Sequence, residues 1–300
     1  KKRVLYAGEN HNEAAEILQR ELEARRGSPL PGLACLNTVI GKMSGTVRGF
    51  HEIKRLGLEP LTPDLPRAVL VESFNRILVS RNPHAGLARG ITVFEEKENL
   101  LPFEEAKLFG HNAVHYALAC MALRKGLRVM SEVRADGLLM DFGKELFGEM
   151  GSALAQRHRK LSDPLFTLEG FKAYGDDLLT RMTNPFLRDD VARVSRDPVR
   201  KLAPGDRLLG AITTCLAEGV EPRGFGRAAA AGLHHLARHQ EGAPSDVLKL
   251  LPSPGAALSR EAGIRIMDAL WARALAPGVF AQVCEWGPRG QAWLSEKGLN

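Results

Sequence analysis

The sequence has few aromatic residues and no long hydrophobic run. Aromatic side chains make up 6% of the 300 residues, so Leu, Val, Ile and Ala must supply most of the core. No stretch reaches the roughly 18 uninterrupted apolar residues that a membrane-spanning helix needs, and the first residues, Lys1-Lys2-Arg3-Val4, contain no secretory h-region. A protein of the cytoplasm without a membrane partner is therefore expected.

Cysteine is scarce as well. Four cysteines are spread widely along the chain, at positions 35, 120, 215 and 284, and none forms a C-x-x-C pair. This spacing argues against zinc ribbons and thioredoxin-like redox chemistry. The four are expected to be buried free thiols in a reducing compartment.

Charge of one sign is not in large excess. The chain has 41 Lys and Arg against 35 Asp and Glu, a formal net charge of +6. No basic stripe with interleaved aromatic residues is present, so nucleic acid is not an expected partner. A small anionic substrate or cofactor explains the surplus equally well, and nothing in the sequence indicates an oligomeric state.

The spacing of apolar residues changes along the chain. Residues 1–96 have an α/β texture, with strand-like runs at 3–8, 33–40, 68–71 and 76–79 and a helix over 13–26. Apolar residues then recur every three to four positions. This spacing predicts helices over 102–125, 138–159, 168–183, 189–196, 206–218, 227–239 and 261–275. We therefore expect a mainly α protein, in which an α/β segment (1–96) precedes a helical domain (97–300).

The predicted helix over 102–125 carries a concentrated set of polar side chains. On an α-helical wheel, four of them fall within an arc of about 140°. They are Glu104, Lys107, Asn112 and His115. A lysine could take a hydroxyl proton while an amide N–H donates to the developing oxyanion. The alternative is an ordinary solvated helix face.

Two sequence blocks resemble a known enzyme family. Lys107, Asn112 and His115 form K-x4-N-x2-H, and residues 184–202 match N-P-x-L-x-D-x-x-x-R-V-x-R-x-P-x-R-K-L. Both are typical of the polyol-specific long-chain dehydrogenases, which include mannitol dehydrogenase and mannitol-1-phosphate 5-dehydrogenase. Two looser matches are Leu36–Lys42 and the turn Gly8-Glu9-Asn10. They depart from the family at Lys42 (usually Arg), Gly41 (usually Asp) and Gly8 (usually Cys).

The resemblance implies a fold and a cofactor. It implies a helical substrate domain like that of 6-phosphogluconate dehydrogenase, preceded by the last part of a Rossmann-type domain whose first βαβ units are absent here. It implies NAD as the cofactor, with NADP not excluded, and no metal. It gives no cofactor-binding residue within this chain.

The resemblance also implies a role for each matching residue. Lys107 would be the general base that deprotonates the alcohol, and Glu104 would connect that base to solvent. Asn112 and Asn10 would donate hydrogen bonds to the reacting oxygen, and His115 would orient the substrate hydroxyls. Arg193 and Lys201 match substrate-binding positions of the family.

A cluster of cations suggests the chemical class of the substrate. Six lie within twenty residues: Arg188, Arg193, Arg196, Arg200, Lys201 and Arg207. Facing a cleft, they could hold a sugar phosphate through charge-assisted hydrogen bonds. The alternative is a solvated helix face on which the cations pair with Asp189, Asp190, Asp197 and Asp206.

These observations predict a zinc-independent, NAD(P)-dependent oxidation of a hexitol or hexitol phosphate to the 2-keto sugar. Uronate reductases and arabinitol dehydrogenases share the Lys-Asn-His set, so the exact polyol stays open. A different alternative is a non-catalytic protein that keeps the helical domain and binds a polyol, a sugar phosphate or a partner.

Three further sequence features are assigned to structure rather than to a functional site. Gly224–Ala229 matches G-x-G-x-x-[GA] but follows a predicted helix rather than a strand, so it is expected to be a helix-entry loop. His234, His235 and His239 are not expected to bind a metal, because no carboxylate or cysteine converges with them. Cys120 is assigned to packing.

Overall fold

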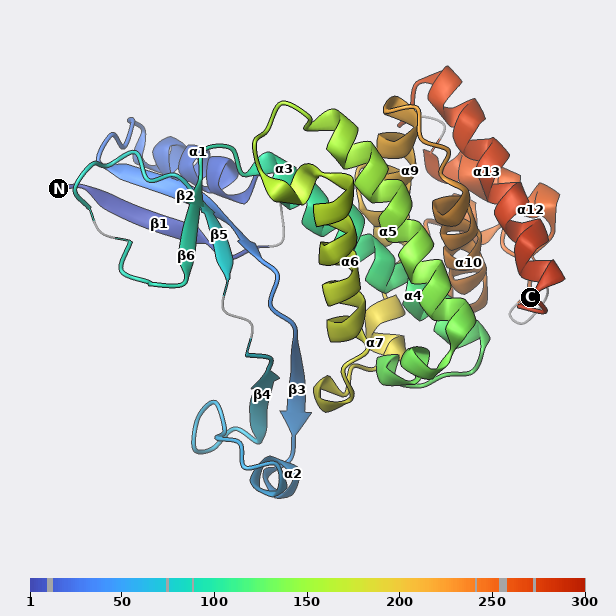
Figure 1. Cartoon of the computed structure of the whole chain (residues 1–300), viewed down its shortest axis with the longest axis horizontal. Coiled ribbons are helices and arrows are strands. Elements are labelled where there is room, and N and C mark those ends of the chain that lie inside the picture. The colour runs from blue at the N-terminus through green and yellow to red at the C-terminus, as the bar shows by residue number, and fades with distance from the viewer. Residues whose placement is uncertain are drawn as a thin grey trace. The chain divides into compact units, whose positions relative to one another are not determined.

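The computed structural model describes residues 1–9, 13–73, 76–87, 89–240, 242–253, 258–271 and 274–299 (Figure 1). The chain forms two compact units, Lys1–Lys107 and Leu108–Asn300. The expected division between residues 96 and 97 stays a prediction.

The first unit contains a four-stranded mixed sheet. In spatial order its strands are β1 (Arg3–Ala7), β2 (Leu33–Ile40), β5 (Ile77–Ser80) and β6 (Phe94–Lys97). β1 runs parallel to β2 and β5 parallel to β6, whereas β2 and β5 are antiparallel. Helix α1 (Ala14–Arg26) packs on β2. The strand expected over 3–8 is present, but β1 is an edge strand of the described sheet and Ala7 is its one buried residue.

A second, two-stranded sheet also belongs to the first unit. It pairs β3 (Ser44–Arg48) with β4 (Arg67–Val71), and helix α2 (Phe50–Arg55) lies between them in the chain. Val47, Ile53 and Ala68 form a small core of their own. Periodicity indicated β4, which is rich in apolar residues, but missed α2, β3 and β6, which contain too few apolar residues to form an apolar run or repeat.

The second unit is helical, as expected. Its helices are α4 (Ala113–Arg124), α5 (Gly137–Arg157), α6 (Leu168–Met182), α7 (Val191–Ser195), α8 (Pro198–Lys201), α9 (Arg207–Ala217), α10 (Arg223–His239), α11 (Ser245–Leu248), α12 (Arg260–Trp271) and α13 (Pro277–Glu296). Helix α4 is central and packs against α5, α7, α9 and α10. Every residue from Ala113 to Ala122 is buried except His115. The prediction of a mainly α fold is confirmed.

The polar helix predicted over 102–125 is not a regular α-helix. It begins as α3 (Leu101–Glu105), continues as a π-helical segment, Ala106–Asn112, and resumes as α4. The expectation of one uninterrupted α-helical wheel is therefore wrong. Hydrogen bonds from i to i+5 widen the turn between Lys107 and Asn112, so the 100° step does not hold there. The boundary between the two units falls inside this π segment.

Glycines bring α10 and α13 close together. A Cβ on Gly226 would lie 2.9 Å from Trp286 Cβ, and a Cβ on Gly290 would lie 2.4 Å from the Gly226 carbonyl oxygen. The expectation that residues 224–229 form a helix-entry loop is wrong, because α10 already begins at Arg223. These glycines permit helix packing. The α13 helix was not predicted from the sequence.

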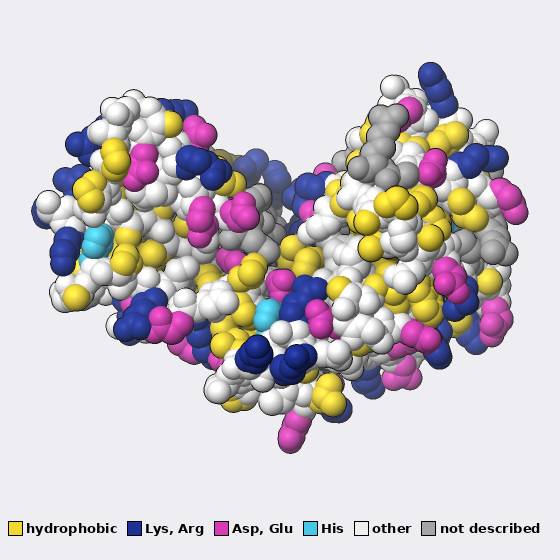
Figure 2. Space-filling view, turned by 90° about the horizontal axis from the view of Figure 1, so that it is seen from above, with side chains coloured by type: hydrophobic (Ala, Val, Ile, Leu, Met, Phe, Trp, Pro, Cys, Tyr) yellow, Lys and Arg dark blue, Asp and Glu magenta, His cyan; other side chains and the backbone are white. Residues whose placement is uncertain are grey.

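On the face drawn in Figure 2, Lys and Arg side chains are interspersed with Asp and Glu rather than gathered in one stripe. None of the described helices is long and apolar enough to cross a bilayer. All four cysteines are free. Cys120 and Cys215 are buried as expected, but Cys35 and Cys284 are partly exposed, so the expectation of burial is wrong for those two.

Candidate functional site

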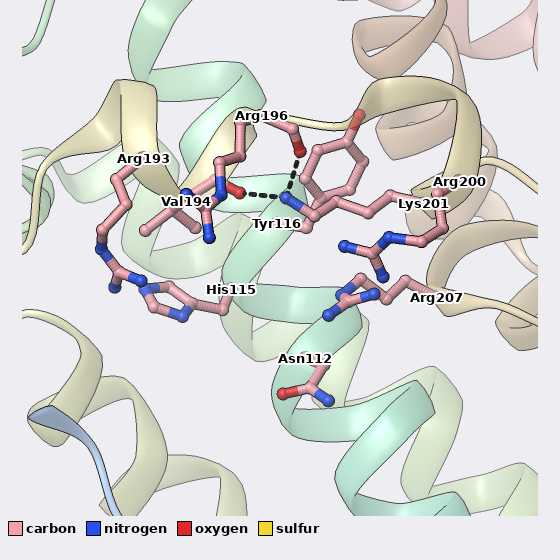
Figure 3. A pocket seen from close by; sticks show the side chains of 9 residues that line it. All are labelled: Asn112, His115, Tyr116, Arg193, Val194, Arg196, Arg200, Lys201 and Arg207. Atoms are coloured by element: carbon pink, nitrogen blue, oxygen red, sulfur yellow. Dashed lines mark hydrogen bonds between the residues drawn. The ribbon is translucent and has the colours of Figure 1, made fainter. Parts of the chain in front are cut away.

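A cavity of about 200 Å³ lies in the helical unit, where α4 faces α7, α8 and the start of α9 (Figure 3). The residues that line it are Asn112, His115, Tyr116, Arg193, Val194, Arg196, Arg200, Lys201 and Arg207. It therefore combines two residues of the K-x4-N-x2-H motif with five of the six clustered cations. The sixth cation, Arg188, is not among the lining residues.

Asn112 ends the π segment and presents its amide to this cavity. Its Nδ2 atom is buried and has no hydrogen-bond partner among the described residues. A buried amide donor without a partner carries a free-energy cost that a ligand oxygen would remove. The geometry therefore fits a donor to a substrate oxygen.

His115 contacts a carboxylate that sequence reasoning did not assign to it. Its Nε2 atom lies 3.2 Å from Asp189 Oδ2, and both side chains are largely buried. The contact is electrostatic rather than a well-aligned hydrogen bond. Asp189 was considered only as a partner for the neighbouring cations. Its fixed place in the N-P-x-L-x-D pattern is the signal that could have identified it.

The backbone and Arg193 hold Asp189 in place. Its carbonyl oxygen accepts a hydrogen bond of 2.8 Å from Met130 N, and its Oδ1 accepts one of 2.9 Å from Arg193 Nε. Burial alone would raise the pKa of Asp189. The contacts with His115 and Arg193 outweigh burial and hold that pKa below its ordinary value. Asp189 is thus an anchored carboxylate behind the His115 ring.

Lys201 is the most buried of the clustered cations. Its Nζ donates to the carbonyl oxygens of Val194, at 2.8 Å, and Arg196, and it lies 5.0 Å from the centre of the Tyr116 ring. Burial, reinforced by the nearby charge of Arg207, lowers the pKa of Lys201 to about 8. An ammonium has three donors, so one N–H remains for a ligand. Lys201 therefore caps the C-terminus of α7 and also lines the cavity.

The other cations are partly paired with the neighbouring aspartates, as expected of a solvated helix face, and they also line the cavity. Arg200 lies 3.2 Å from Asp197 and 3.5 Å from Asp206, and Arg207 lies 2.7 Å from Asp206. Arg196 is 3.9 Å from Asp197. The five cations that line the cavity outnumber their partners Asp189, Asp197 and Asp206 by two. In Figure 3 the guanidinium groups of Arg200 and Arg207 point into the same space as the Asn112 amide.

Glu104 and Lys107 belong to the first unit. Burial raises the pKa of Glu104 to about 7; the charge of Glu16 adds to the rise and Lys107 opposes it. The Glu16 carboxylate is held in place by Asn37, whose Nδ2 donates to Glu16 Oε2 at 2.7 Å. The Oδ1 atom of Asn37 in turn accepts from Ala15 N at 2.8 Å. A carboxyl group that titrates near neutrality beside a lysine can pass a proton in either direction.

One predicted site residue is not among those that the structure describes. Asn10 lies outside the described residues, and its neighbours Gly8 and Glu9 directly follow β1. No group of three or more His, Cys, Asp or Glu side chains in the described ranges is arranged to hold a metal ion.

The glycine-rich run does not fit a dinucleotide. Residues 224–229 lie inside α10, and Trp286 occupies the space beside Gly226. A phosphate cradle needs that space and a preceding strand.

Comparison with known proteins supports the motif assignment. The sequence profile of the mannitol dehydrogenase C-terminal domain matches residues 99–252, which include α4, α7, α8 and every residue that lines the cavity. The chain belongs to the mannitol dehydrogenase family. The expected family resemblance is therefore confirmed. Residues from two separate sequence blocks typical of this family meet at one cavity.

One curated relative is mannitol-1-phosphate 5-dehydrogenase of Brevibacillus brevis. It is 32% identical to this chain over 165 residues, which are 55% of this chain and 41% of the relative. The chain thus spans less than half the length of that relative.

Two solved structures share the fold. They are Pseudomonas fluorescens mannitol 2-dehydrogenase, in a ternary complex with NAD and D-mannitol, and a D-sorbitol dehydrogenase in substrate-free form. The first has a TM-score of 0.63 at 16% identity and covers 99% of this chain and 60% of its own. The second has a TM-score of 0.65 at 15% identity, and the match covers 96% of this chain and 62% of the sorbitol dehydrogenase chain. At this identity the likeness shows the fold alone.

Proposed function

We propose that this chain carries the substrate-binding and acid–base residues of an NAD(P)-dependent polyol dehydrogenase that oxidises a hexitol phosphate to the 2-keto sugar. The observation that carries the proposal is the cavity in which Asn112, whose Nδ2 has no partner among the described residues, meets His115 and five cations. Family membership supports the reaction class. The Pseudomonas mannitol 2-dehydrogenase structure, with its NAD and D-mannitol, supports the cofactor.

In this proposal Lys107 is the general base that accepts the proton of the substrate hydroxyl. Glu104, whose pKa is raised to about 7 chiefly by burial, relays that proton to solvent. The two residues interact within the first unit, which supports the relay. Asn112 donates to the oxygen as negative charge develops on it, together with Asn10.

His115 would position the neighbouring substrate hydroxyls, with Asp189 fixing the ring. Arg193 and Lys201 would contact the substrate through donors that face the cavity. When bound, a nicotinamide cofactor supplies the acceptor for the hydride. No metal is invoked, because the lysine performs the deprotonation that a zinc ion assists in other alcohol dehydrogenases.

A phosphate group on the substrate would account for the excess of positive charge. Arg200 and Arg207 offer planar guanidinium groups that suit a phosphate. Together with Lys201 they surround one end of the cavity opposite His115. A neutral polyol would leave this excess charge uncompensated.

An assay of the intact protein with polyols tests the proposal. Oxidation of mannitol 1-phosphate, sorbitol 6-phosphate, mannitol and sorbitol would be followed by NADH or NADPH formation. We expect kcat/KM to be at least tenfold higher for the phosphates. Equal turnover of free and phosphorylated polyols would remove the phosphate assignment. Binding of a polyol phosphate without any turnover would favour the alternative, a non-catalytic binding protein.

A further inference from the structure

A second cavity of about 270 Å³ lies on the next turns of α4, between that helix and α10. Its lining residues are Cys120, Leu123, Arg124, Ala231, His234, His235, Arg238 and His239. It shares no lining residue with the first cavity. A water molecule occupies about 30 Å³ in the liquid, so this cavity has room for a small polyatomic ligand.

Two residues that line this cavity each carry a buried nitrogen atom without a hydrogen-bond partner among the described residues. His234 is more than nine-tenths buried, and its Nε2 atom has no hydrogen-bond partner among the described residues. Arg124 donates through Nε to the carbonyl oxygen of Leu299, but its buried Nη2 atom has no partner in the part of the chain that the structure describes. Leaving such donors unpaired is costly, and more so for a charged guanidinium. An acceptor bound in the cavity that these two residues line is a candidate partner for both.

The charge around the cavity has one sign. Arg124 and Arg238 are close enough that the charge of Arg238, after burial, lowers the pKa of Arg124. Burial, and then the charge of Arg124, lowers the pKa of His234 to about 4. No carboxylate is among the described lining residues. Burial also keeps the Cys120 thiol protonated, with a pKa of about 12.

His235 and His239 extend the same surface toward solvent. Their ring centres are 4.5 Å apart. Burial, followed by the charge of His239, lowers the pKa of His235 to about 4. Lys201 lowers that pKa further, whereas a hydrogen bond with the Ser195 backbone opposes the shift. The neutral imidazoles can donate N–H groups without carrying charge. The combination of two arginines with the imidazole of His234, and no carboxylate among the described lining residues, suits a multivalent oxygen anion.

We propose that this cavity is a second, separate anion site, which binds a phosphate-type oxyanion through Arg124, His234 and Arg238. The oxyanion is inorganic phosphate or the phosphate group of a small metabolite. The proposal does not depend on the activity assigned to the first cavity. A metal is disfavoured as the occupant, because these histidines form no metal-binding group with other described residues.

Histidine NMR of the intact protein tests the site. The imidazole C–H resonances would be titrated with pH in the absence and presence of millimolar inorganic phosphate, with His234→Gln used to assign the signal. We expect phosphate to raise the pKa of His234 by at least one unit, because an anion stabilises the imidazolium. Sodium chloride at matched ionic strength should leave that pKa unchanged. An unchanged pKa in phosphate, or an equal response to chloride, would overturn the proposal.

Variants separate this cavity from the first one. Arg238→Met changes an exposed side chain, so the fold should persist, and we expect it to weaken the phosphate Kd read from His234 by about tenfold. Arg200→Met, in the first cavity, should leave that Kd unchanged. An effect of Arg200→Met as large as that of Arg238→Met would assign the signal to the first cavity. Tighter binding of glycerol 3-phosphate than of inorganic phosphate would identify a phosphate ester as the occupant, and the reverse order the free ion.

Discussion

His115 Nε2 lies 3.2 Å from Asp189 Oδ2, and the other oxygen of the same carboxylate accepts from Arg193 Nε at 2.9 Å. One carboxylate thus joins a residue of the K-x4-N-x2-H motif to a residue of the basic segment. Met130 N donates to the backbone carbonyl oxygen of Asp189 and so fixes the backbone that carries this carboxylate. We infer that Asp189 positions His115 and Arg193 for the substrate.

Replacing Asp189 tests this relationship. Asp189→Asn keeps the size of the side chain but removes the charge that orients both partners. We expect KM for the polyol substrate to rise about tenfold with a smaller change in kcat, since a charged hydrogen-bonding partner contributes roughly 1.5–3 kcal/mol. Asp177→Asn, on α6, removes an exposed ion pair with Arg181 and should leave both constants unchanged. Equal losses in the two variants would argue against a positioning role.

Lys107 is the residue on which the proposed chemistry depends. Lys107→Met removes the base while keeping most of the aliphatic chain, and we expect kcat to fall by about 10²–10⁴ with a fold unchanged by circular dichroism. Lys144→Met removes an exposed lysine that pairs with Asp141 and serves as the control. Wild-type turnover by Lys107→Met at neutral pH would eliminate the lysine-base mechanism.

Arg200 and Arg207 should discriminate between phosphorylated and free polyols. In the double variant Arg200→Met/Arg207→Met we expect KM for the polyol phosphate to rise by at least tenfold, while KM for the free polyol changes little. Arg188→Met lies in the same segment but outside the cavity lining, so it should affect neither substrate. A parallel loss for both substrates in the double variant would indicate that these arginines only maintain the fold.

Glu104 makes stability depend on pH. Its folded-state pKa of about 7, raised from 4.5 mainly by burial, means that the folded state holds the proton more tightly than the unfolded state. The native state is therefore destabilised as pH rises from about 4.5 to 7, and the penalty is complete above 7. Glu104→Gln lacks the penalty. We expect it to unfold with a free energy about 3 kcal/mol higher than wild type at pH 8 and equal to it at pH 4.

Denaturant unfolding at several pH values measures this difference. Glu149 also has a pKa raised to about 7 by burial and is present in both proteins, so its contribution cancels. A difference between wild type and Glu104→Gln that stayed constant from pH 4 to 8 would show that Glu104 does not titrate as described.

The contact between α10 and α13 tolerates no side chain at Gly290. Gly290→Ala would place a Cβ 2.4 Å from the Gly226 carbonyl oxygen and 2.7 Å from Arg227 N, so the two helices must separate. We expect a loss of about 1–3 kcal/mol in the free energy of unfolding, measured by denaturant titration. Gly148→Ala, within α5 and with nothing within 4 Å of the added Cβ, should instead gain about 0.5–1 kcal/mol. A stabilised Gly290→Ala would contradict the close approach.

The helices of the second unit could be predicted where they are long and periodic, as with α5, α6 and α9. Helix α13 was missed because Gly278, Gly287 and Gly290 lower its intrinsic propensity, and packing against α10 overrides that deficit. The π segment was missed because an i to i+5 hydrogen-bond pattern leaves no compositional mark. It is the π turn that decides how Asn112 is directed relative to the residues before it.

The sequence by itself determined the family, the helical character of the second unit and the identity of its polar residues, because these follow from local pattern and residue chemistry. Only the tertiary structure decided which of those residues meet. His115 and Asp189 lie on segments far apart in the chain, and the cavity that joins Asn112 to the basic segment exists because α7 and α8 fold back onto α4. Burial likewise decided which groups titrate near neutrality, since desolvation depends on surroundings that no linear pattern records.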